Sequence, residues 1–342
     1  MTDDTAPPFA ALTPDCILDA MDSVGLRADG RLLALNSYEN RVYQIGIEAG
    51  FEADAPERSA SYVVAKFYRP ARWPDDAIIE EHAFVAELAA REIPVVPALP
   101  IADGQTLHEF GGFRFAVFPK FGGRAPELDD TATLEWIGRF IGRIHAIGAL
   151  RPFHARPELN LASFGEEPMR YLLSSGFIPV DLIDAYGSVM AQALDGVRRC
   201  YDRAGTSRTL RLHGDCHAGN MLWTDSGPHF VDFDDCRTGP AIQDLWMLLS
   251  GERLDMQRQM ASVLAGYESF SDFDARELHL VEALRTLRLI HYSAWLAKRW
   301  NDPAFPAAFP WFNTQRYWQD RILELREQIA LMDEPPILTA AR

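Results

Sequence analysis

The octapeptide at residues 213–220, His-Gly-Asp-Cys-His-Ala-Gly-Asn, constrains this chain more than any other feature of its sequence. It follows a short apolar run at residues 210–212, and a second apolar run at residues 229–231 leads into Asp-Phe-Asp-Asp at 232–235. Short apolar runs of this kind predict buried β-strands. Each strand ends in carboxylates, amides or imidazoles, which are costly to bury unless they are paired. The pattern therefore predicts a polar site at the ends of two strands.

A hairpin between the two runs would bring the polar residues together. Residues 221–224 predict a further short strand, and the turn-forming residues 225–228 close it. Asp215 precedes Asn220 by five positions, and Asp232 follows Asn220 by twelve. We expect these three side chains to lie near one another on loops at a common edge.

The residue types at this edge suit phosphoryl transfer from a magnesium nucleotide. That reaction needs an aligned nucleophile and neutralised phosphate charge more than it needs covalent help from the protein. Asp215 is the candidate base, which accepts or orients the attacking hydroxyl. Asn220 and Asp232 offer the hard oxygen ligands that Mg²⁺ prefers. An Asp followed by Asn five positions later is a weak signal alone, but His-Gly-Asp before that Asn, with an apolar strand ending in Asp after it, is a strong one.

The same octapeptide also fits a metal-dependent hydrolase. His213, Asp215 and His217 form His-x-Asp-x-His, and alternate residues of a strand share a face. Against this alternative, no further His or Cys pair follows at ligand spacing, and Asn220 would have no role. A purely structural role leaves too many carboxylates at buried strand ends. Kinase chemistry is therefore favoured over metal hydrolysis, and both over a structural role.

These residues resemble the aminoglycoside-phosphotransferase-like branch of the protein-kinase fold. Within that branch, the chain is similar to the stress response kinase A family of bacterial serine/threonine protein kinases. The other matching segments are Ala-Leu-Asn-Ser-Tyr-Glu-Asn-Arg-Val-Tyr at 34–43, Lys-Phe-Tyr-Arg-Pro at 66–70, Gly-Pro-Ala-Ile-Gln-Asp-Leu-Trp-Met-Leu-Leu at 239–249 and Asp-Pro-Ala-Phe-Pro at 302–306. The likeness thus covers nearly the whole chain.

The resemblance implies an α+β, bilobal protein-kinase-like fold. A small sheet N-lobe at residues 1–118 would cover ATP, and a larger helical C-lobe at residues 119–342 would carry the catalytic loop and the acceptor. Gly122 and Gly123 lie in the linker, where they fit either a hinge or a plain turn. The resemblance also implies that Asp244 accepts backbone hydrogen bonds from the Asp215 loop, although a favourable position in the helix dipole explains it equally well.

The N-lobe supplies a predicted cation for the nucleotide phosphates. Residues 62–68 predict a strand that carries Lys66, and a buried lysine must be paired with a carboxylate. The following helix, predicted at residues 75–91, offers two candidates. Glu81 is preferred because it lies within one or two turns of the inward apolar residues, and Glu80 is the second choice.

The turn at residues 36–41 occupies the place of a kinase phosphate-covering loop. No glycine occurs between Asn36 and Arg41, so the turn departs from the glycine-rich pattern. The resemblance implies that Ser37 contacts phosphate. A hairpin turn rich in Asn and Ser explains the local sequence equally well.

Composition limits the partners of the chain. The 33 Lys and Arg against 49 Asp and Glu leave a net charge of −16, which argues against general binding to nucleic acid or anionic membranes. The four cysteines show no paired spacing, so reduced thiols are expected. The N-terminus lacks an apolar signal segment, and no run reaches the length of a membrane span. We expect a cytoplasmic protein, and the resemblance implies a monomer that acts in stress response.

Together these features predict an ATP- and Mg²⁺-dependent serine/threonine protein kinase, with a protein acceptor that includes the chain itself among the candidates. The predicted catalytic residues are Asp215 and Asp232, the metal ligands Asn220 and Asp232, and the nucleotide-binding residues Ser37, Lys66 and Glu81. One alternative is a small-molecule kinase of the aminoglycoside, choline or homoserine type. A second is a nucleotide-binding regulator without turnover, which the missing glycines motivate. The kinase hypothesis requires Lys66 and Asp232 to lie together.

Overall fold

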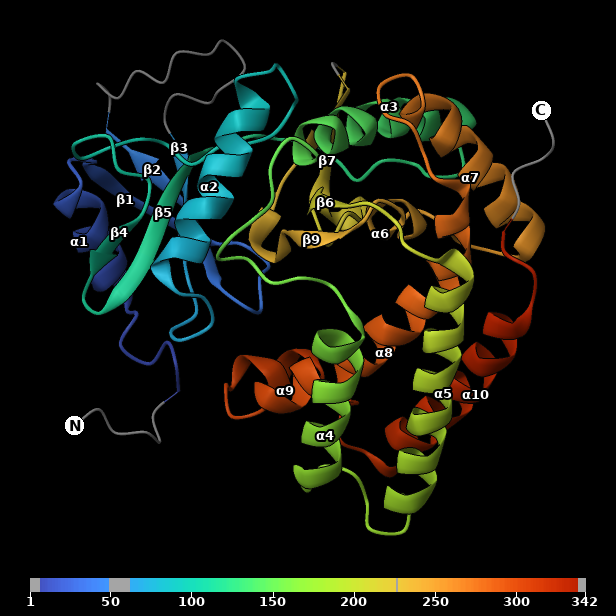
Figure 1. The fold of residues 1–342 in the computed structure, drawn as a ribbon. Coiled ribbons are helices and arrows are strands. Elements are labelled where there is room, and N and C mark those ends of the chain that lie inside the picture. Colours follow the sequence, from blue (N-terminus) through green and yellow to red (C-terminus); the bar gives the residue numbers. More distant parts are fainter. Residues whose placement is uncertain (1–6, 49–61, 226, 338–342) are drawn as a thin grey trace. The chain divides into compact units, whose positions relative to one another are not determined.

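The structure, a computed structural model, describes residues 7–48, 62–225 and 227–337 (Figure 1). The chain divides into two compact units. The first comprises Met1–Pro126, His154–Arg156 and Gly219–Asp234, and the second comprises Glu127–Phe153, Pro157–Ala218 and Asp235–Arg342. The first unit thus includes two later segments that the predicted N-lobe, residues 1–118, does not contain. The first residues of the chain, on which the expected absence of a signal segment rests, lie outside the described part.

A five-stranded antiparallel sheet forms the centre of the first unit (Figure 1). Its strands, in spatial order, are β1 (Ala28–Ala34), β2 (Arg41–Ile47), β3 (Tyr62–Phe67), β5 (Phe113–Pro119) and β4 (His108–Phe110). The helix α2 (Asp75–Ala89) follows β3 in the chain. On β3, Lys66 lies opposite Val42 of β2 and Ala116 of β5. Lys66 therefore occupies the middle strand, where pairing on both sides fixes its backbone.

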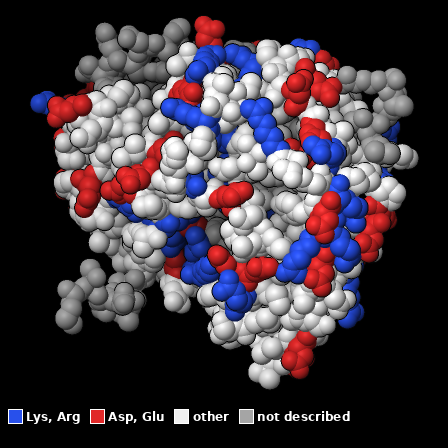
Figure 2. All heavy atoms as spheres, viewed as in Figure 1, with Lys and Arg blue, Asp and Glu red and all other residues white. Residues whose placement is uncertain are grey.

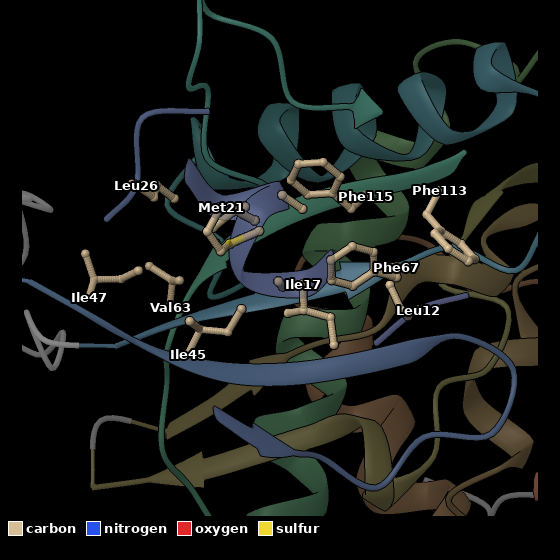
Figure 3. Packing of buried hydrophobic residues seen from close by; sticks show 13 residues of the cluster. Leu12, Ile17, Met21, Leu26, Ile45, Ile47, Val63, Phe67, Phe113 and Phe115 are labelled. Carbon is tan, nitrogen blue, oxygen red and sulfur yellow. The ribbon is translucent and has the colours of Figure 1, made fainter. Parts of the chain in front are cut away.

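The helix α1 (Pro14–Ser23) contributes to the hydrophobic core of the first unit (Figure 3). The helix begins after a capping residue, since the Thr13 hydroxyl accepts a hydrogen bond of 3.2 Å from the Cys16 N–H. Ile17 and Met21 of α1 share this core with residues of the sheet, among them Ile45, Val63, Phe67, Phe115 and Val117. Burial of this apolar cluster stabilises the sheet on which Lys66 lies.

The predicted central hairpin is present in the first unit as β7 (Met221–Thr224) and β8 (Gly227–Phe230), which pair antiparallel. The segment after β5 joins it, since Arg124 and Trp223 exchange backbone hydrogen bonds of 3.1 and 2.7 Å. A Cβ atom on Gly123 would lie 2.7 Å from Leu222 Cβ, so only glycine fits there. This close approach to β7 accounts for Gly123 without a hinge.

The second unit is mainly helical. Its helices are α3 (Thr131–Gly148), α4 (Glu167–Ser174), α5 (Ile183–Ala204), α6 (Ile242–Trp246), α7 (Arg253–Tyr267), α8 (Val281–Lys298), α9 (Ala304–Ala308) and α10 (Gln315–Asp333). The helices α5, α8 and α10 pack against one another (Figure 1). The short strands β6 (Thr209–Leu212) and β9 (Arg237–Pro240) pair antiparallel.

Glycines set the close packing around α3. A Cβ atom on Gly138 would lie 2.1 Å from the backbone oxygen of Val263 in α7, and one on Gly142 would lie 2.5 Å from that of Tyr267. At the end of α3, a Cβ on Gly148 would lie 2.2 Å from the backbone oxygen of Arg211 in β6. The three glycines thus bring backbones together in a way that any larger residue would prevent. This packing holds β6, the strand that leads into the octapeptide.

The strand β9 has no predictive pattern in the sequence, because Arg-Thr-Gly-Pro lacks apolar alternation. It forms through backbone pairing with β6 and with Glu158. A 3₁₀ segment, Ala275–Leu280, precedes α8 in the chain.

Within the described residues, no helix combines the length and the apolar character needed to cross a membrane. On the face drawn in Figure 2, basic and acidic side chains lie interspersed among uncharged ones. The negative net charge is therefore not expressed as a uniform acidic surface on that face.

Candidate active site

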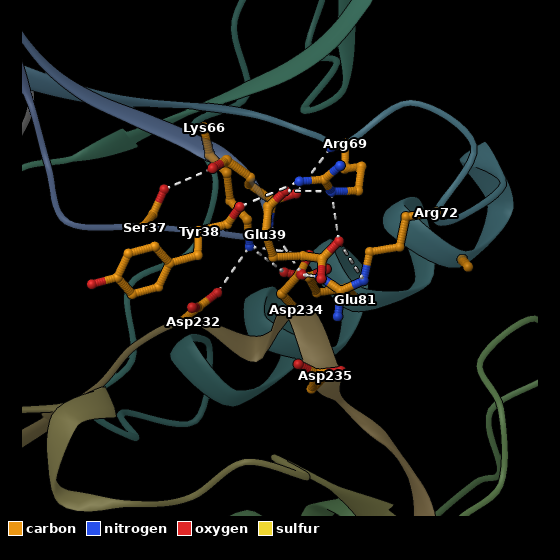
Figure 4. A network of polar contacts seen from close by, with 12 residues as sticks. Ser37, Tyr38, Glu39, Lys66, Arg69, Arg72, Glu81, Asp232, Asp234 and Asp235 are labelled. Carbon is orange, nitrogen blue, oxygen red and sulfur yellow. Dashed lines mark hydrogen bonds and ion pairs between the residues drawn. The ribbon is translucent and has the colours of Figure 1, made fainter. Parts of the chain in front are cut away.

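Lys66 is buried in the first unit among three carboxylates (Figure 4). Its Nζ lies 3.0 Å from Asp232 Oδ1, 3.2 Å from Asp234 Oδ1 and 3.9 Å from Glu81 Oε1. Burial acts to lower the pKa of Lys66, but the three carboxylates outweigh it and raise that pKa well above its ordinary value. The amine therefore stays protonated. Lys66 and Asp232, which the kinase hypothesis requires to lie together, are in direct contact.

Glu81 on α2 is held by a second cation. Its Oε2 accepts a hydrogen bond from the Arg156 guanidinium, which also donates to the backbone oxygens of Ala77 at 2.9 Å and Asp234 at 2.7 Å. Burial raises the pKa of Glu81 to about 7, although Lys66 and Arg156 act in the opposite direction. Because Glu81 is the most distant of the three carboxylates around Lys66, it orients the amine more than it neutralises it.

Glu80, the second candidate for that partner, has a different set of contacts. Its carboxylate accepts the backbone N–H groups of His154 at 2.7 Å, Ala155 at 2.8 Å and Arg156 at 3.0 Å. These bonds fix the segment that carries the Arg156 guanidinium. Glu80 thus supports Glu81 indirectly and does not pair with Lys66.

The β7–β8 hairpin brings Asn220 and Asp232 together in the first unit. Met221 lies opposite Phe230, and one step further the Val231 N–H donates to the Asn220 backbone oxygen at 3.0 Å. Asp232 follows at once with φ +59°, a left-handed conformation that aspartate adopts at a cost. Its side chain remains 55% exposed. A carboxylate and a carboxamide from adjoining positions form a hard oxygen donor set that fits Mg²⁺.

The turn between β1 and β2 is held by side chains in the absence of glycine. The Ser37 hydroxyl donates to the Asn40 backbone oxygen at 2.8 Å, so it stabilises the turn itself. The Arg69 N–H donates to Asn40 Oδ1 at 3.0 Å, and Arg69 Nε donates to the Glu39 backbone oxygen at 3.0 Å. These bonds give the turn one conformation where a glycine-rich loop would have several.

Asp234 connects this turn to Lys66 (Figure 4). Its Oδ2 accepts a hydrogen bond of 3.1 Å from Asn40 Nδ2 and pairs with the Arg72 guanidinium. Asp234 is only 4% exposed, so these cations and the amide compensate a charge that would otherwise be costly to bury. Asp234 therefore positions the turn, the lysine and the segment after β8 as one network.

The second unit holds the Asp215 loop through its backbone. Gly214 has φ +85°, and a Cβ atom there would lie 2.2 Å from the Asp235 backbone oxygen, so the position admits only glycine. Asp244 of α6 accepts the His213 N–H through Oδ2 and the Gly214 N–H through Oδ1, both at 2.8 Å. These are the backbone hydrogen bonds that the family resemblance implied for Asp244.

Asp244 is itself fixed by a buried histidine. His145 Nε2 lies 3.0 Å from Asp244 Oδ2, and His145 Nδ1 lies 3.0 Å from the Tyr267 hydroxyl. His145 and Asp244 are almost fully buried. His145 is therefore a packed histidine, held between Asp244 and Tyr267.

Asp215 faces two basic side chains within the second unit. Arg288 Nη1 of α8 lies 2.7 Å from Asp215 Oδ1, and His217 Nε2 lies 3.4 Å from Asp215 Oδ2. Burial acts to raise the pKa of Asp215, but His217 and Arg288 lower it well below its usual range. Asp215 is therefore an ionised hydrogen-bond acceptor across the physiological pH range.

The metal-hydrolase alternative finds no support among the described residues, where no group of three or more His, Cys, Asp or Glu side chains could hold a metal ion. His213 is fully buried, and its Nδ1 lies 3.3 Å from the Asp215 N–H. Cys216 and Cys236 are also buried, and burial raises the pKa of Cys216 well above its ordinary value. A protonated, buried thiol reacts slowly with oxidants.

The structure brings the predicted residues Lys66, Glu81 and Asp232 together in the first unit and places the Asn220 backbone beside Asp232. The predicted base Asp215 lies in the second unit. The sequence analysis did not single out Asn40, Arg72, Arg156 or Arg288 as partners, and it did not place Asp234 in the site. No local pattern marks these residues, because each acts across a long sequence separation.

Residues 31–281 match the phosphotransferase enzyme family, so the chain belongs to this family and is an enzyme that transfers a phosphoryl group. A protein named stress response kinase A from Salmonella choleraesuis strain SC-B67 is 45% identical over 335 residues, with 98% of each chain covered. The serine/threonine protein kinase RdoA of Salmonella typhimurium strain LT2 is also 45% identical over 335 residues, again with 98% of each chain covered. Stress response kinase A of Escherichia coli strain K12 is 44% identical over 330 residues, with 96% of each chain covered.

Solved structures agree on the α+β bilobal kinase-like fold. Amicoumacin kinase hAmiN, in complex with AMP-PNP, Ca²⁺ and amicoumacin, matches with a TM-score of 0.70 at 20% identity and covers 94% of this chain and 95% of its own. A microcompartment-associated aminopropanol kinase matches with a TM-score of 0.67 at 19% identity and covers 93% and 96%. At these identities the likeness shows the fold alone.

Proposed function

We propose that this enzyme is a serine/threonine protein kinase that uses ATP and Mg²⁺. The observation that carries the proposal is the meeting of Lys66 with Glu81 and Asp232 in one buried network of the first unit. The β7–β8 hairpin adds Asn220 next to Asp232. This set supplies the positive charge and the hard oxygen donors that a nucleotide triphosphate requires.

In the proposed reaction, Lys66 binds the α- and β-phosphates and Glu81 orients Lys66. The β1–β2 turn contacts the phosphates through Ser37 and backbone N–H groups. Asn220 and Asp232 hold Mg²⁺, which neutralises phosphate charge when it is bound. Because Asp232 is the exposed carboxylate of the Lys66 network, it is the one available to a ligand.

Asp215 orients the acceptor hydroxyl. The hydroxyl oxygen forms a bond to the γ-phosphorus while the bond from that phosphorus to the β–γ bridging oxygen breaks, and ADP leaves. The hydroxyl proton passes to Asp215 as the new bond forms. A carboxylate of low pKa suits this role, because the attacking hydroxyl keeps most of its proton in a loose transition state.

The protein acceptor is proposed from the relatives. Chains 44 and 45% identical over almost their full length bear the names of a stress response kinase and a serine/threonine protein kinase. A cytoplasmic, monomeric protein that acts in stress response remains our prediction. A small-molecule kinase is the alternative, motivated by the names of the structural neighbours, an amicoumacin kinase and an aminopropanol kinase. The regulator without turnover is set aside, because the matching family is one of phosphotransferase enzymes.

Incubation of the purified chain with γ-labelled ATP and Mg²⁺ tests the proposal. We expect label on the chain itself and on a general protein substrate. We expect Asp215→Asn to lower the rate of transfer by about 10³-fold, because the hydroxyl loses its acceptor, while binding of an ATP analogue is kept. In contrast, Asp232→Asn should weaken binding of the Mg²⁺ complex of that analogue.

Three outcomes would contradict the proposal. Label found only in small metabolites from a cell extract would favour the small-molecule kinase. Tight ATP binding with no transfer to any acceptor would contradict the proposed kinase reaction. Undiminished transfer by Asp215→Asn would remove Asp215 from its assigned role.

A further inference from the structure

Two basic side chains lie beside Asp215, the proposed base. Arg288 contacts one oxygen of Asp215 at 2.7 Å, and His217 lies 3.4 Å from the other. The side chain of Arg288 is 42% exposed, that of His217 is 39% exposed and that of Asp215 is 24% exposed. All three are therefore accessible to a molecule that presents a hydroxyl to Asp215.

Apart from Asp215, the contacts of the Arg288 guanidinium are weak. Its guanidinium touches Met247 Sδ at 4.0 Å besides Asp215. One turn earlier on α8, Arg285 differs, since it pairs with Glu282 at 3.1 Å and lies over the Trp246 ring at 5.5 Å. The guanidinium of Arg288 carries five N–H donors, and one carboxylate oxygen occupies only part of this donor set. Arg288 can thus bind a second anion while it stays beside Asp215.

We propose that Arg288 is a specificity-determining residue that selects acceptors with a carboxylate or phosphate next to the reactive hydroxyl and rejects cationic acceptors. This inference rests on the proposed function, and it specifies the substrate class as Ser or Thr within an acidic segment. A guanidinium recognises carboxylate and phosphate groups through paired N–H donors, which gives direction as well as charge. His217 adds a second basic group on the other side of the base.

The negative net charge of the protein favours cationic acceptors, whereas Arg288 favours anionic ones. The distance over which each charge acts decides which preference prevails. The net charge of −16 attracts cations at long range. Salt screens exposed charges beyond a Debye length of about 8 Å under physiological conditions. An acceptor group in contact with Arg288 lies well inside that length, so the guanidinium dominates its selection.

The inference separates this enzyme from kinases of amines. Choline, aminoglycosides and aminopropanol all carry positive charge near the hydroxyl. A cation placed beside Asp215 would have to approach the Arg288 guanidinium, which repels it. Like charge placed against a binding group is an effective means of discrimination.

Peptide acceptors provide the test. One serine peptide is prepared in three forms, with Asp and Glu, with Ala, or with Lys next to the serine, and kcat/KM is measured with the full chain and Mg²⁺-ATP. We expect wild type to prefer the acidic over the neutral peptide by about tenfold, which is moderate because Arg288 is partly exposed. Arg288→Ala should lose this preference, and Arg288→Glu should invert it in favour of the Lys peptide. Arg285→Ala, the matched control on α8, should keep the wild-type preference.

The results distinguish failure of the inference from failure of the proposed function. If wild type phosphorylates peptides without regard to charge, or if Arg288→Glu keeps the acidic preference, the inference is wrong and the protein kinase stands. If Arg288→Ala weakens binding of an ATP analogue and leaves the acidic-to-neutral ratio unchanged, Arg288 belongs to nucleotide binding and the inference is wrong. If wild type phosphorylates no peptide, the proposed protein acceptor falls.

Small acceptors complete the test. Choline, an aminoglycoside and glycerate are offered to wild type under the same conditions. Transfer to choline or the aminoglycoside would overturn the inference. Transfer to glycerate but not to acidic peptides would support the selection of negative charge. It would also mean that the acceptor is a small molecule and not a protein.

Discussion

The two units compensate their buried carboxylates in different ways. In the first unit, Glu81 and Asp234 are paired with Lys66, Arg72 and Arg156. In the second unit, Asp244 accepts backbone N–H groups of the octapeptide and contacts one histidine. Glu277 there accepts the Ile242 N–H at 2.9 Å. The first unit thus pairs its buried carboxylates with cationic side chains, whereas the second unit uses buried carboxylates to hold backbone N–H groups in place.

This difference matches the two tasks of phosphoryl transfer. Nucleotide phosphates need several cations near one another, and those cations must be held apart by carboxylates while no nucleotide is bound. The acceptor hydroxyl needs a single carboxylate in a fixed direction, which a rigid loop supplies. Variants that each remove one polar side chain test this difference between the units.

Asp244→Ala should give the largest loss of stability, about 4 kcal/mol of unfolding free energy. The variant leaves the His213 and Gly214 N–H groups and His145 without a buried acceptor. Urea unfolding measures the change, and Asp244→Asn, which keeps one acceptor oxygen, should lose less. A loss below about 1 kcal/mol for Asp244→Ala would mean that the loop does not depend on this carboxylate.

Glu277 should make stability depend on pH in the second unit. Burial raises the pKa of Glu277 to about 7 from an ordinary value of 4.5, with opposition from the Ile242 N–H. Because the folded state favours the protonated form, this contribution is fully present below pH 4.5 and is lost as pH rises through about 7. The rise in pKa corresponds to about 3 kcal/mol of unfolding free energy.

Glu277→Gln should remove this decline, since the amide stays neutral and can still accept the Ile242 N–H. Unfolding free energies of wild type and variant, measured between pH 4.5 and pH 8, check the prediction. The exposed Glu327 on α10 provides the control, and Glu327→Gln should follow the wild-type profile. Parallel profiles for wild type and Glu277→Gln would show that Glu277 does not titrate with folding.

Asn40→Ala should have the smallest effect and should act on the nucleotide. Without the bonds from Asn40 to Asp234 and to the Arg69 N–H, the β1–β2 turn loses its fixed conformation. We expect the KM for ATP to rise about tenfold, which corresponds to two hydrogen bonds of modest net strength. Faster hydrogen exchange at residues 36–41 should accompany it. Asn160→Ala, which removes a turn contact to Ser163 in the second unit, is the control, and equal KM values in both variants would contradict the role of Asn40.

Local patterns were sufficient for much of the fold and part of the site. Apolar runs predicted the strands β3 and β6 and the β7–β8 hairpin, because burial on a pleated surface leaves a short period in the sequence. The strand β9 was missed because Arg-Thr-Gly-Pro has no such period. Glu81 was preferred over Glu80 on helical spacing, and the structure shows contacts of Glu81 with Lys66.

The sequence by itself determined the phosphotransferase family, the octapeptide and the hairpin that aligns Asn220 with Asp232. Tertiary structure alone decided which further charges meet and why position 214 admits only glycine. Arg288 contacts Asp215 across 73 positions, and Asn40 contacts Asp234 across 194. The physical reason is that periodicity shows which face of a helix or strand is buried, whereas the partner of a charged side chain depends on how distant elements pack. The proposed selection of acidic acceptors therefore follows from packing and not from any motif.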